Sequence, residues 1–347
     1  MELGIGMFGD LAMDPQTGKY QSAQQRLNEI IEEIKLMDEL GLDFFGIGEH
    51  HRPDYAVSSP EILLAAAATV TKNIKLGSAV TVLSSSDPVK VYQNFAMIDL
   101  ISNGRAEIMA GRGSFIESFP LFGYNLNDYE DLFVEKLDLL LEINKNERVT
   151  WKGRHRAELN DQEILPRATK NELPIWLAVG GTPQSVVRAG RLGLPLMLAI
   201  IGGSPRQFKP LVDLYREEYK FANHDPANMK VGIHSHSFFG DNASSLSDMY
   251  YPLYAAQMNR IGRTRGWQPY HRSQFEAGKT KDGALFIGEP EAMIDKILYA
   301  QEMFGLDRFS AHMDVGGPSH KDMMKSIEVF GTKIAPKVRE ALAKKDS

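Results

Sequence analysis

The chain has 347 residues, of which 43% are hydrophobic and 24% charged, with a formal net charge of -6 and no cysteine. This composition is ordinary for a globular protein and excludes disulfides, thiolate nucleophiles and cysteine-based zinc sites, while the acidic balance leaves no basic face for a nucleic acid. The first residues have no basic segment ahead of an apolar run, and no stretch of about 18 apolar residues occurs, so we expect a cytoplasmic protein with no membrane partner.

Short apolar runs alternate with longer amphipathic ones from the first residues onward. Residues 3–8 predict a strand, and residues 24–40 predict a helix with apolar positions three and four apart that ends at Gly41. The run 74–83 is almost continuously apolar, as expected for a parallel strand covered on both faces. Further strands are predicted at 43–47 and 106–110, and the helices of this half at 60–71, 88–101 and 131–143.

The second half of the chain continues the same alternation. Strands are predicted at 175–179, 194–201, 231–239 and 309–313, and helices at 183–192, 206–222, 290–304 and 320–341. Eight strands, each followed by a helix, predict a closed (β/α)8 TIM barrel. A doubly wound open sheet is the competing architecture, but it seldom needs eight such units. We expect one domain over residues 1–347, with insertions at about 114–130, 144–173 and 240–285.

A barrel of this kind carries its active site at the C-terminal ends of the strands. Residues with useful chemistry lie at six of the predicted ends. They are Glu49, His50 and His51; Ala79 and Val80; Gly111, Arg112 and Gly113; Gly180, Gly181 and Thr182; His234, Ser235 and His236; and His312 with Asp314.

The segment 180–185 has the features of an anion site. Two glycines and Thr182 end a strand just before a helix that starts near Pro183, so backbone N–H groups and the positive end of a helix dipole meet there. Two glycines also fit a plain strand-to-helix turn, and Arg112 also fits an ion pair with a neighbouring helix. Together they favour a phosphate-bearing ligand, because an arginine between glycines can bind a phosphate bidentately. A nucleotide or FMN fits, whereas a dinucleotide wrap or a P-loop is disfavoured, because no GxxxxGK[ST] occurs and no GxGxxG follows a predicted strand and opens a predicted helix.

Three segments together carry a resemblance to a known family. Residues 41–51 (GLDFFGIGEHH), 80–113 and 175–198 resemble the corresponding segments of the bacterial luciferase-like, flavin-dependent monooxygenases. The resemblance implies a (β/α)8 barrel and an oxidoreductase that acts on paired donors with incorporation of molecular oxygen. It also implies reduced FMN supplied by a separate NAD(P)H:flavin reductase, a small organic substrate and a homodimer.

The same resemblance implies roles for individual residues. Arg112 matches the phosphate-binding arginine of the family, with Gly180, Gly181, Thr182 and Ser185 in the phosphate loop, and His50 matches a histidine implicated in catalysis. Ala79 and Val80 match a non-prolyl cis peptide that shapes the seat of the flavin ring. Gly111 stands where luciferases carry a reactive cysteine, so we do not expect light emission from a long-chain aldehyde.

The histidines admit more than one role. An ordinary pKa near 6.5 lets His50 exchange a proton near neutrality, but the side chain could instead only pack or anchor its loop. Glu49 and His51 are expected to fix its position. His234 and His236, two apart on one strand, point to the same side and face the pocket only if that side is inward. Flavin-wall candidates that equally fit the core are Met7, Phe8 and Met109.

Three other functions compete with an FMN monooxygenase. One is hydride transfer with the deazaflavin F420 on the same fold, and another is flavin binding without turnover. The third is a metal-dependent barrel hydrolase, but it gives the glycine-threonine loop no role, and we expect no metal. Its ligands would come from Glu49, His50, His234, His236, His312 and Asp314. The insertions carry aromatic residues that favour a partly apolar organic substrate, namely Phe115, Phe119, Phe122, Tyr124, Trp267 and Tyr270.

Overall fold

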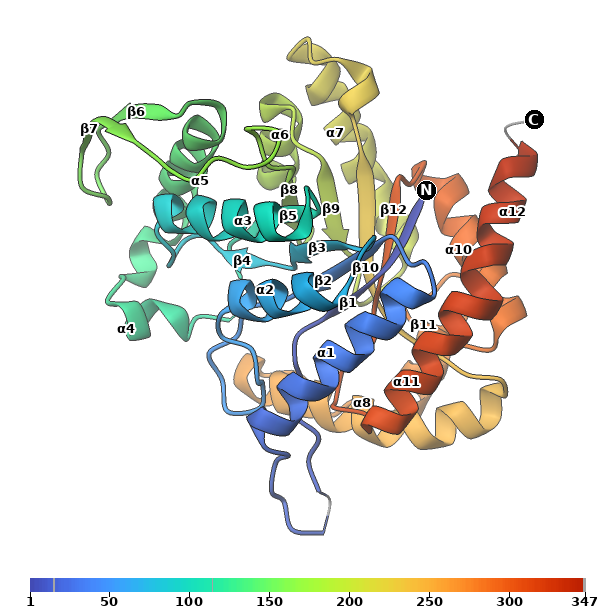
Figure 1. Cartoon of the computed structure of the whole chain (residues 1–347). Helices are drawn as coiled ribbons and strands as arrows, with labels where there is room; N and C mark the ends of the chain where they lie inside the picture. Colours follow the sequence, from blue (N-terminus) through green and yellow to red (C-terminus); the bar gives the residue numbers. More distant parts are fainter. Residues whose placement is uncertain (15, 114, 346–347) are drawn as a thin grey trace.

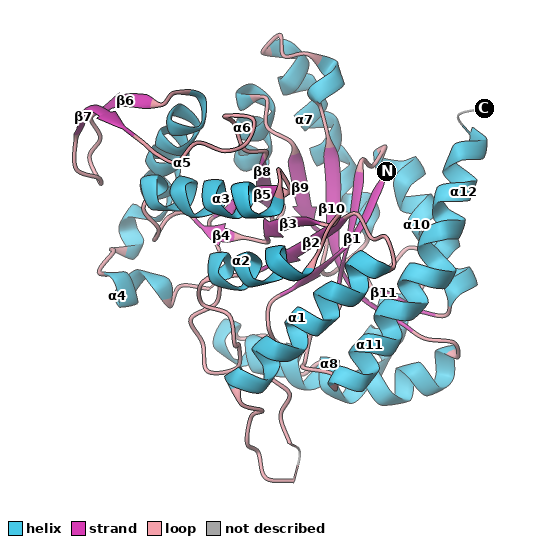
Figure 2. Ribbon diagram, viewed as in Figure 1, coloured by secondary structure: helices cyan, strands magenta, loops and turns pink. Residues whose placement is uncertain are grey.

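Eight parallel strands close into a barrel with helices on its outside (Figures 1 and 2). The computed structural model describes residues 1–14, 16–113 and 115–345. Residue 114 of the predicted insertion 114–130, and residues 15, 346 and 347 of the predicted domain 1–347, lie outside the described residues. The barrel strands are β1 (Glu2–Met7), β2 (Phe44–Ile47), β3 (Lys75–Ser78), β5 (Ala106–Gly111), β8 (Ile175–Val179), β9 (Leu196–Ala199), β10 (Val231–Phe239) and β12 (Arg308–His312).

The barrel closes between its first and last strands. β1 pairs with β2 on one side and with β12 on the other, and β9 pairs with β10, so the strand order returns to its start. Every one of these pairings is parallel, because each connection passes through a helix on the outside. The predicted (β/α)8 barrel is therefore confirmed.

The surrounding helices begin and end where the sequence provides signals. Pro60, Pro88, Pro183 and Pro290 open their helices in the first turn, where the missing N–H costs nothing. Within the described residues, no helix is both long enough and apolar enough to cross a membrane. The helices are α1 (Ala23–Glu39), α2 (Pro60–Val70), α3 (Pro88–Ser102), α5 (Tyr129–Lys145), α6 (Pro183–Leu192), α7 (Lys209–Phe221), α10 (Pro290–Phe304), α11 (His320–Val329) and α12 (Ala335–Lys345).

Some predicted elements differ from the structure. The single strand expected at 74–83 is divided, since β3 ends at Ser78 and a short β4 (Thr81–Val82) pairs with β5. The helix expected at 206–222 starts with a 3-10 turn (Pro205–Phe208), and a π-helical turn (Phe330–Ile334) separates α11 from α12. Both differences are local changes of hydrogen-bond pattern that an apolar period does not encode.

The segments expected as insertions contain secondary structure of their own. Residues 144–173 form a hairpin of β6 (Arg148–Trp151) and β7 (Leu159–Glu163), at the opposite end of the view from α8 in Figure 1. Residues 240–285 form α8 (Ala243–Arg265) and α9 (Arg272–Lys279). The remaining elements are α4 (Ser118–Phe122), β11 (Phe286–Gly288), which pairs with the end of β10, and two 3-10 turns at Leu126–Asp128 and Pro226–Asn228.

Side chains fill the inside of the barrel. Phe44, Met109, Trp176 and Met197 form an apolar cluster with Ala79 that is separate from the core between strands and helices. Below it, the fully buried guanidinium of Arg308 lies 4.2 Å from the ring centre of Phe44 and 4.3 Å from that of Trp176. Arg308 also pairs with Glu2 and Glu107, so the N-terminal end of the barrel is closed by a paired cation and not by a gap.

Candidate active site

Arg112 and Thr182 meet at one side of the barrel mouth. Arg112 follows β5 and Thr182 follows β8, and the Nη2 of Arg112 donates to the hydroxyl of Thr182 at 3.4 Å. The Nη1 of Arg112 donates to Glu130 at 2.7 Å, and Arg188 donates to the same carboxylate at 2.6 Å. Burial opposes ionisation of Glu130, but the two arginines lower its pKa. Two guanidinium groups therefore share the carboxylate of Glu130.

The loop between β8 and α6 supplies the backbone of this corner. Gly181 has φ +118°, a conformation that L side chains rarely adopt, and a side chain at Gly180 would meet open space. The hydroxyl of Thr182 makes no capping bond to α6 and is turned to Arg112 instead, while Ser185 is buried in the first turn of α6. The structure thus brings the predicted phosphate-loop residues together with Arg112, next to the positive end of a helix dipole.

Glu49 and His51 contact each other, although the sequence predicted that both would hold His50. One oxygen of Glu49 lies 2.9 Å from the ring nitrogen Nε2 of His51, and the other accepts the backbone N–H of Val82 at 2.9 Å. Glu49 therefore links His51 to β4, and it makes no hydrogen bond to the buried Nε2 of His50.

His50 itself lies in an aromatic environment. Its ring centre is 4.4 Å from those of both Phe8 and Tyr55, and its Nε2 is buried with no hydrogen-bond partner among the described residues. Burial, with the nearby His312, lowers the pKa of His50 to about 3. The imidazole is then neutral at physiological pH and acts there as a hydrogen-bonding group, whereas the sequence predicted a group poised near neutrality.

His234 and His236 both point inward. Nδ1 of His234 lies 3.1 Å from the hydroxyl of Ser310, and Nδ1 of His236 lies 2.8 Å from the hydroxyl of Tyr254 on α8. His312 is next to both, with ring centres 4.8 and 5.1 Å away. Burial, followed by the effect of His312, lowers the pKa of both strand-β10 histidines well below the usual value.

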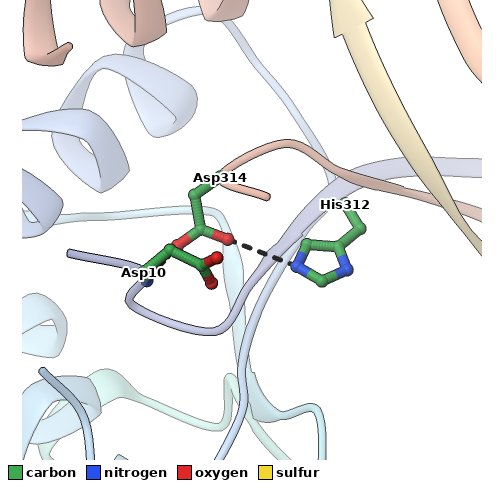
Figure 3. Close-up of side chains that lie close together, drawn as sticks. All are labelled: Asp10, His312 and Asp314. Carbon is green, nitrogen blue, oxygen red and sulfur yellow. Dashed lines mark hydrogen bonds and ion pairs between the residues drawn. The ribbon is translucent and has the colours of Figure 1, made fainter. Parts of the chain in front are cut away.

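Asp314 connects the last strand to the end of the first. Its carboxylate accepts the backbone N–H groups of Phe8, Gly9 and Asp10 at 3.0, 2.8 and 3.2 Å. His312 Nε2 lies 3.3 Å from the same carboxylate, as Figure 3 shows. Burial alone would raise the pKa of Asp314, but the contact with His312 and the other donors lower it to about 2.

The pKa of Asp10 is shifted in the direction opposite to that of Asp314. One of its oxygens accepts the N–H of Gly316 at 2.9 Å, while Oδ1 is buried without a partner among the described residues. Burial, and then the charge of Asp314, raise the pKa of Asp10 well above its usual value. Burial beside an ionised carboxylate therefore favours the neutral acid form of Asp10.

Asp10, His312 and Asp314 also form a group whose ligand atoms lie within 4.8 Å of one another (Figure 3). Both oxygens of Asp314 already accept N–H groups of the loop after β1, and Arg26 approaches Oδ2 to 3.5 Å. A cation would have to displace these bonds, which fix the loop. The geometry does not favour the metal-ligand set considered from the sequence.

A cavity of about 430 Å³ lies between the mouth of the barrel and the segment 240–285. Phe8, Asp10, His236 and His312 contribute to it from the strand ends, and α8 and the segment after it supply the facing wall. Of the aromatic residues expected at the pocket, Phe115, Trp267 and Tyr270 line the cavity, and no described residue of 144–173 does. Phe119 and Tyr124 instead pack with Tyr129 and Lys136, and Phe122 lies against His51.

The three flavin-wall candidates lie in different parts of the structure. Phe8 lines the cavity, whereas Met7 belongs to the core outside the barrel and Met109 to the cluster inside it. The peptide bond between Ala79 and Val80 is cis, as the resemblance implied. A Cβ on Gly111 would lie 2.8 Å from Cγ2 of Val80, so the backbone approaches this bond closely where luciferases carry their cysteine.

Several residues of the site were missed from the sequence. Asp10 stands two residues beyond the predicted first strand, so the strand-end rule could have found it. Tyr254 and Gln257 reach the cavity from α8. Glu130 and Arg188 reach, from α5 and α6, the anion corner, which is the site formed by Arg112, Thr182 and the loop between β8 and α6. No local signal in a helix indicates such a contact between distant segments.

Comparisons with known proteins agree with this geometry. The model of the luciferase-like monooxygenase family matches residues 1–307. A 4-hydroxyprotoasukamycin monooxygenase from Streptomyces nodosus subsp. asukaensis is 25% identical over 332 residues, which cover 90% of this chain and 87% of that protein.

Solved structures with the same fold include enzymes with two kinds of cofactor. The monooxygenase RslO1 from Streptomyces bottropensis has a TM-score of 0.83 at 22% identity and covers 97% of this chain and 99% of its own. The oxygenating constituent of 3,6-diketocamphane monooxygenase from Pseudomonas putida, in complex with FMN, has a TM-score of 0.75 at 21% identity with the same coverage. An F420-dependent secondary alcohol dehydrogenase has a TM-score of 0.73 at 18% identity and covers 98% of this chain and all of its own.

Proposed function

Because the chain belongs to the luciferase-like monooxygenase family, we propose that it is an enzyme that uses reduced FMN and O2 to oxygenate a small organic substrate. The observation that carries the proposal is the anion corner at the mouth of the barrel. There Arg112 and Arg188 share the single carboxylate of Glu130, beside a glycine turn and the N-terminus of α6. This donor set suits the phosphate of a mononucleotide.

The residues present fit FMN at both ends. Arg112, Thr182, the backbone at Gly180 and Gly181, and Ser185 would hold the phosphate. Ala79–Val80 and Gly111 would seat the ring, and a similar protein holds FMN on the same fold. When bound, the reduced flavin supplies the electrons and the site of oxygen activation.

The chain's own side chains have four tasks in this reaction. Phe8, Tyr55 and Phe115, which surround His50, exclude water from the reacting centre. His50, neutral and with an unpaired Nε2, accepts or donates one hydrogen bond at that nitrogen, and we propose it as the catalytic residue. Glu49 and His51 position the β2–β4 corner beneath it. His234 and His236 form the substrate side, where His236 lines the cavity.

Hydride transfer with F420 is the second candidate. The same corner could take the phosphodiester of that deazaflavin, and a similar fold carries F420 in a secondary alcohol dehydrogenase. For FMN we propose an NAD(P)H:flavin reductase as the functional partner, because the one GxGxxG match, at residues 4–9, starts inside β1 and opens no helix, unlike the fingerprint of a nicotinamide dinucleotide site.

We also propose a homodimer through the outer faces of α2 and α3, which pack on each other. Ile62, Met97 and Leu100 are 74%, 51% and 46% exposed there, and α2 carries a single charged residue, Glu61. α3 adds the exposed Lys90, and an apolar face with few charges is complementary to a second copy of itself. Leu100→Asp should convert the dimer to a monomer in light scattering, whereas Phe221→Asp, at the 79% exposed Phe221 of α7, should not. A monomeric native protein contradicts this assembly.

The cofactor assignment is tested by titration. Purified protein should bind FMN or anaerobically reduced FMN, followed by flavin fluorescence and absorbance. With a flavin reductase, NADH and O2, the loaded protein should consume oxygen and release hydrogen peroxide when no substrate is present. Micromolar binding of F420 with no affinity for either form of FMN overturns the FMN assignment. Flavin binding without any oxygen consumption leaves only a flavin carrier.

A further inference from the structure

The cavity has two walls of different chemistry. Asp10, His236 and His312 contribute to it from the ends of β1, β10 and β12. The opposite wall is formed by α8 and the segment after it, and carries mainly apolar and aromatic side chains, among them Met258, Ile261, Trp267 and Tyr270. A volume of about 430 Å³ is in the range of pockets that take a small organic molecule, about 300–1,000 Å³.

The polar wall has hydrogen-bonding capacity that the protein leaves unused. Nδ1 of His312 and Oδ1 of Asp10 are buried without a partner among the described residues. The ring of His236 is held at Nδ1 by the hydroxyl of Tyr254, so its orientation is fixed while Nε2 remains for a ligand. Buried polar groups of this kind cost free energy unless a ligand pairs with them.

The polar wall is also unsuited to a charged ligand. Burial keeps His236 and Tyr254 neutral by lowering the pKa of the imidazole and raising that of the phenol. Behind them lies the ionised carboxylate of Asp314, which repels an anion. Among the described residues no lysine lines the cavity, and the arginine that does, Arg265, lies over Phe115 and Trp267 at 5.7 and 5.3 Å from their ring centres.

We infer that the cavity takes a neutral, ring-containing molecule with one hydroxyl or carbonyl oxygen, which bonds to His236 while the ring lies against the α8 wall. The inference rests on the proposed function only in taking this cavity as the substrate site. His236 is then the residue that selects an oxygen-bearing ring over a bare hydrocarbon, and Tyr254 is a positioning residue that acts through His236.

Four naphthalene probes of similar shape test the inference by calorimetry on the full chain, with and without FMN. They are naphthalene, 2-naphthol, 2-naphthoate and 2-naphthylmethylammonium. We expect 2-naphthol to bind about 10-fold more tightly than each of the others, the size of one hydrogen bond to a buried group. His236→Leu should remove that advantage of 2-naphthol over naphthalene, while His224→Leu, at a histidine outside the cavity, should keep it.

Tyr254→Phe provides a second variant if His236→Leu does not fold, and should reduce the preference for 2-naphthol without changing naphthalene binding. Tighter binding of 2-naphthoate that is lost in Arg265→Gln overturns the inference in favour of an anionic substrate. Tighter binding of the ammonium probe that is lost in Asp10→Asn overturns it in favour of a cation. Equal affinity for naphthalene and 2-naphthol also overturns it. Failure of the cofactor proposal is seen separately, as absence of FMN binding.

Discussion

The carboxylate of Asp314 accepts the backbone N–H of Phe8 at 3.0 Å, across the seam where β12 pairs with β1. The same group accepts the N–H of Gly9 and Asp10. One side chain therefore fixes the loop that carries both Phe8 and Asp10 into the cavity, and the closure of the barrel and the shape of the site depend on the same bonds.

Replacing this carboxylate should destabilise the whole fold. Asp314→Ala leaves three backbone N–H groups without their acceptor and removes one of the carboxylates that pair with the buried guanidinium of Arg26, which keeps Glu33. We expect a loss of about 3–5 kcal/mol in the free energy of unfolding. Urea denaturation measures it. Asp241→Ala, which removes an exposed pair with Lys333, is the control and should cost less than about 1 kcal/mol. Equal losses in the two variants contradict the role given to Asp314.

The buried histidines should make the protein sensitive to acid. The pKa of His50 falls from about 6.5 in the unfolded chain to about 3 in the folded one, and those of His234 and His236 also fall. Between these values the unfolded state binds more protons, so stability is full above pH 6.5 and decreases as the pH falls towards 3. Each histidine contributes up to about 1.4 kcal/mol per pH unit. Thermal unfolding across this range should show a smaller slope for His50→Gln than for the native chain.

Asp10 should show the reverse dependence. Its folded pKa is raised above the unfolded value near 3.8, so the charge that the unfolded chain gains above that pH counts against folding. Asp10→Asn keeps an acceptor for Gly316 and removes the charge. We expect the variant to be more stable than the native chain at pH 8, by about 1 kcal/mol or more, and equal to it near pH 3. A variant that is less stable at both pH values contradicts the assignment of a neutral acid.

Arg112 should decide cofactor affinity. Arg112→Ala removes a bidentate cation from the anion corner, and a lost charge-assisted bond of about 1.5–3 kcal/mol corresponds to weakening FMN binding about 10- to 100-fold. Arg112→Lys should recover part of it. Arg148→Ala, which breaks an exposed pair with Asp161 on the β6–β7 hairpin, should leave the dissociation constant unchanged. Fluorescence titration distinguishes these outcomes, and an unchanged constant in Arg112→Ala argues against this phosphate site.

The contact between Gly111 and Val80 can be tested by a double-mutant cycle. A methyl group at position 111 would lie 2.8 Å from Val80, so Gly111→Ala should destabilise the protein by about 1–3 kcal/mol. Val80→Ala removes the obstructing methyl groups and should recover most of that loss in the double variant. Additive losses would show that another contact excludes a side chain there.

The strand ends were predictable because chemistry in this fold is concentrated there. Arg112, Thr182, His236 and His312 all lie at positions that the sequence indicated, since alternation along a strand and the end of an apolar run are local signals. The break at Ser78 was not predictable from such a run, because Thr81 and Val82 are as apolar and β-branched as the residues before them. Contacts from helices, such as Glu130 to Arg112 and Tyr254 to His236, depend on how distant segments pack, which the spacing of residues along one helix does not contain.

Arg308 and its partners close the N-terminal end of the barrel, and this closure affects the order in which ligands bind. With that end closed by Glu2, Glu107 and the rings of Phe44 and Trp176, ligands reach the interior from the α8 end. For the proposed FMN enzyme, cofactor, oxygen and substrate then share one entrance, and a substrate that arrives first stands in the path of the flavin. We expect stopped-flow release of FMN to slow when a cavity ligand is bound, and a compulsory order of binding in the steady state.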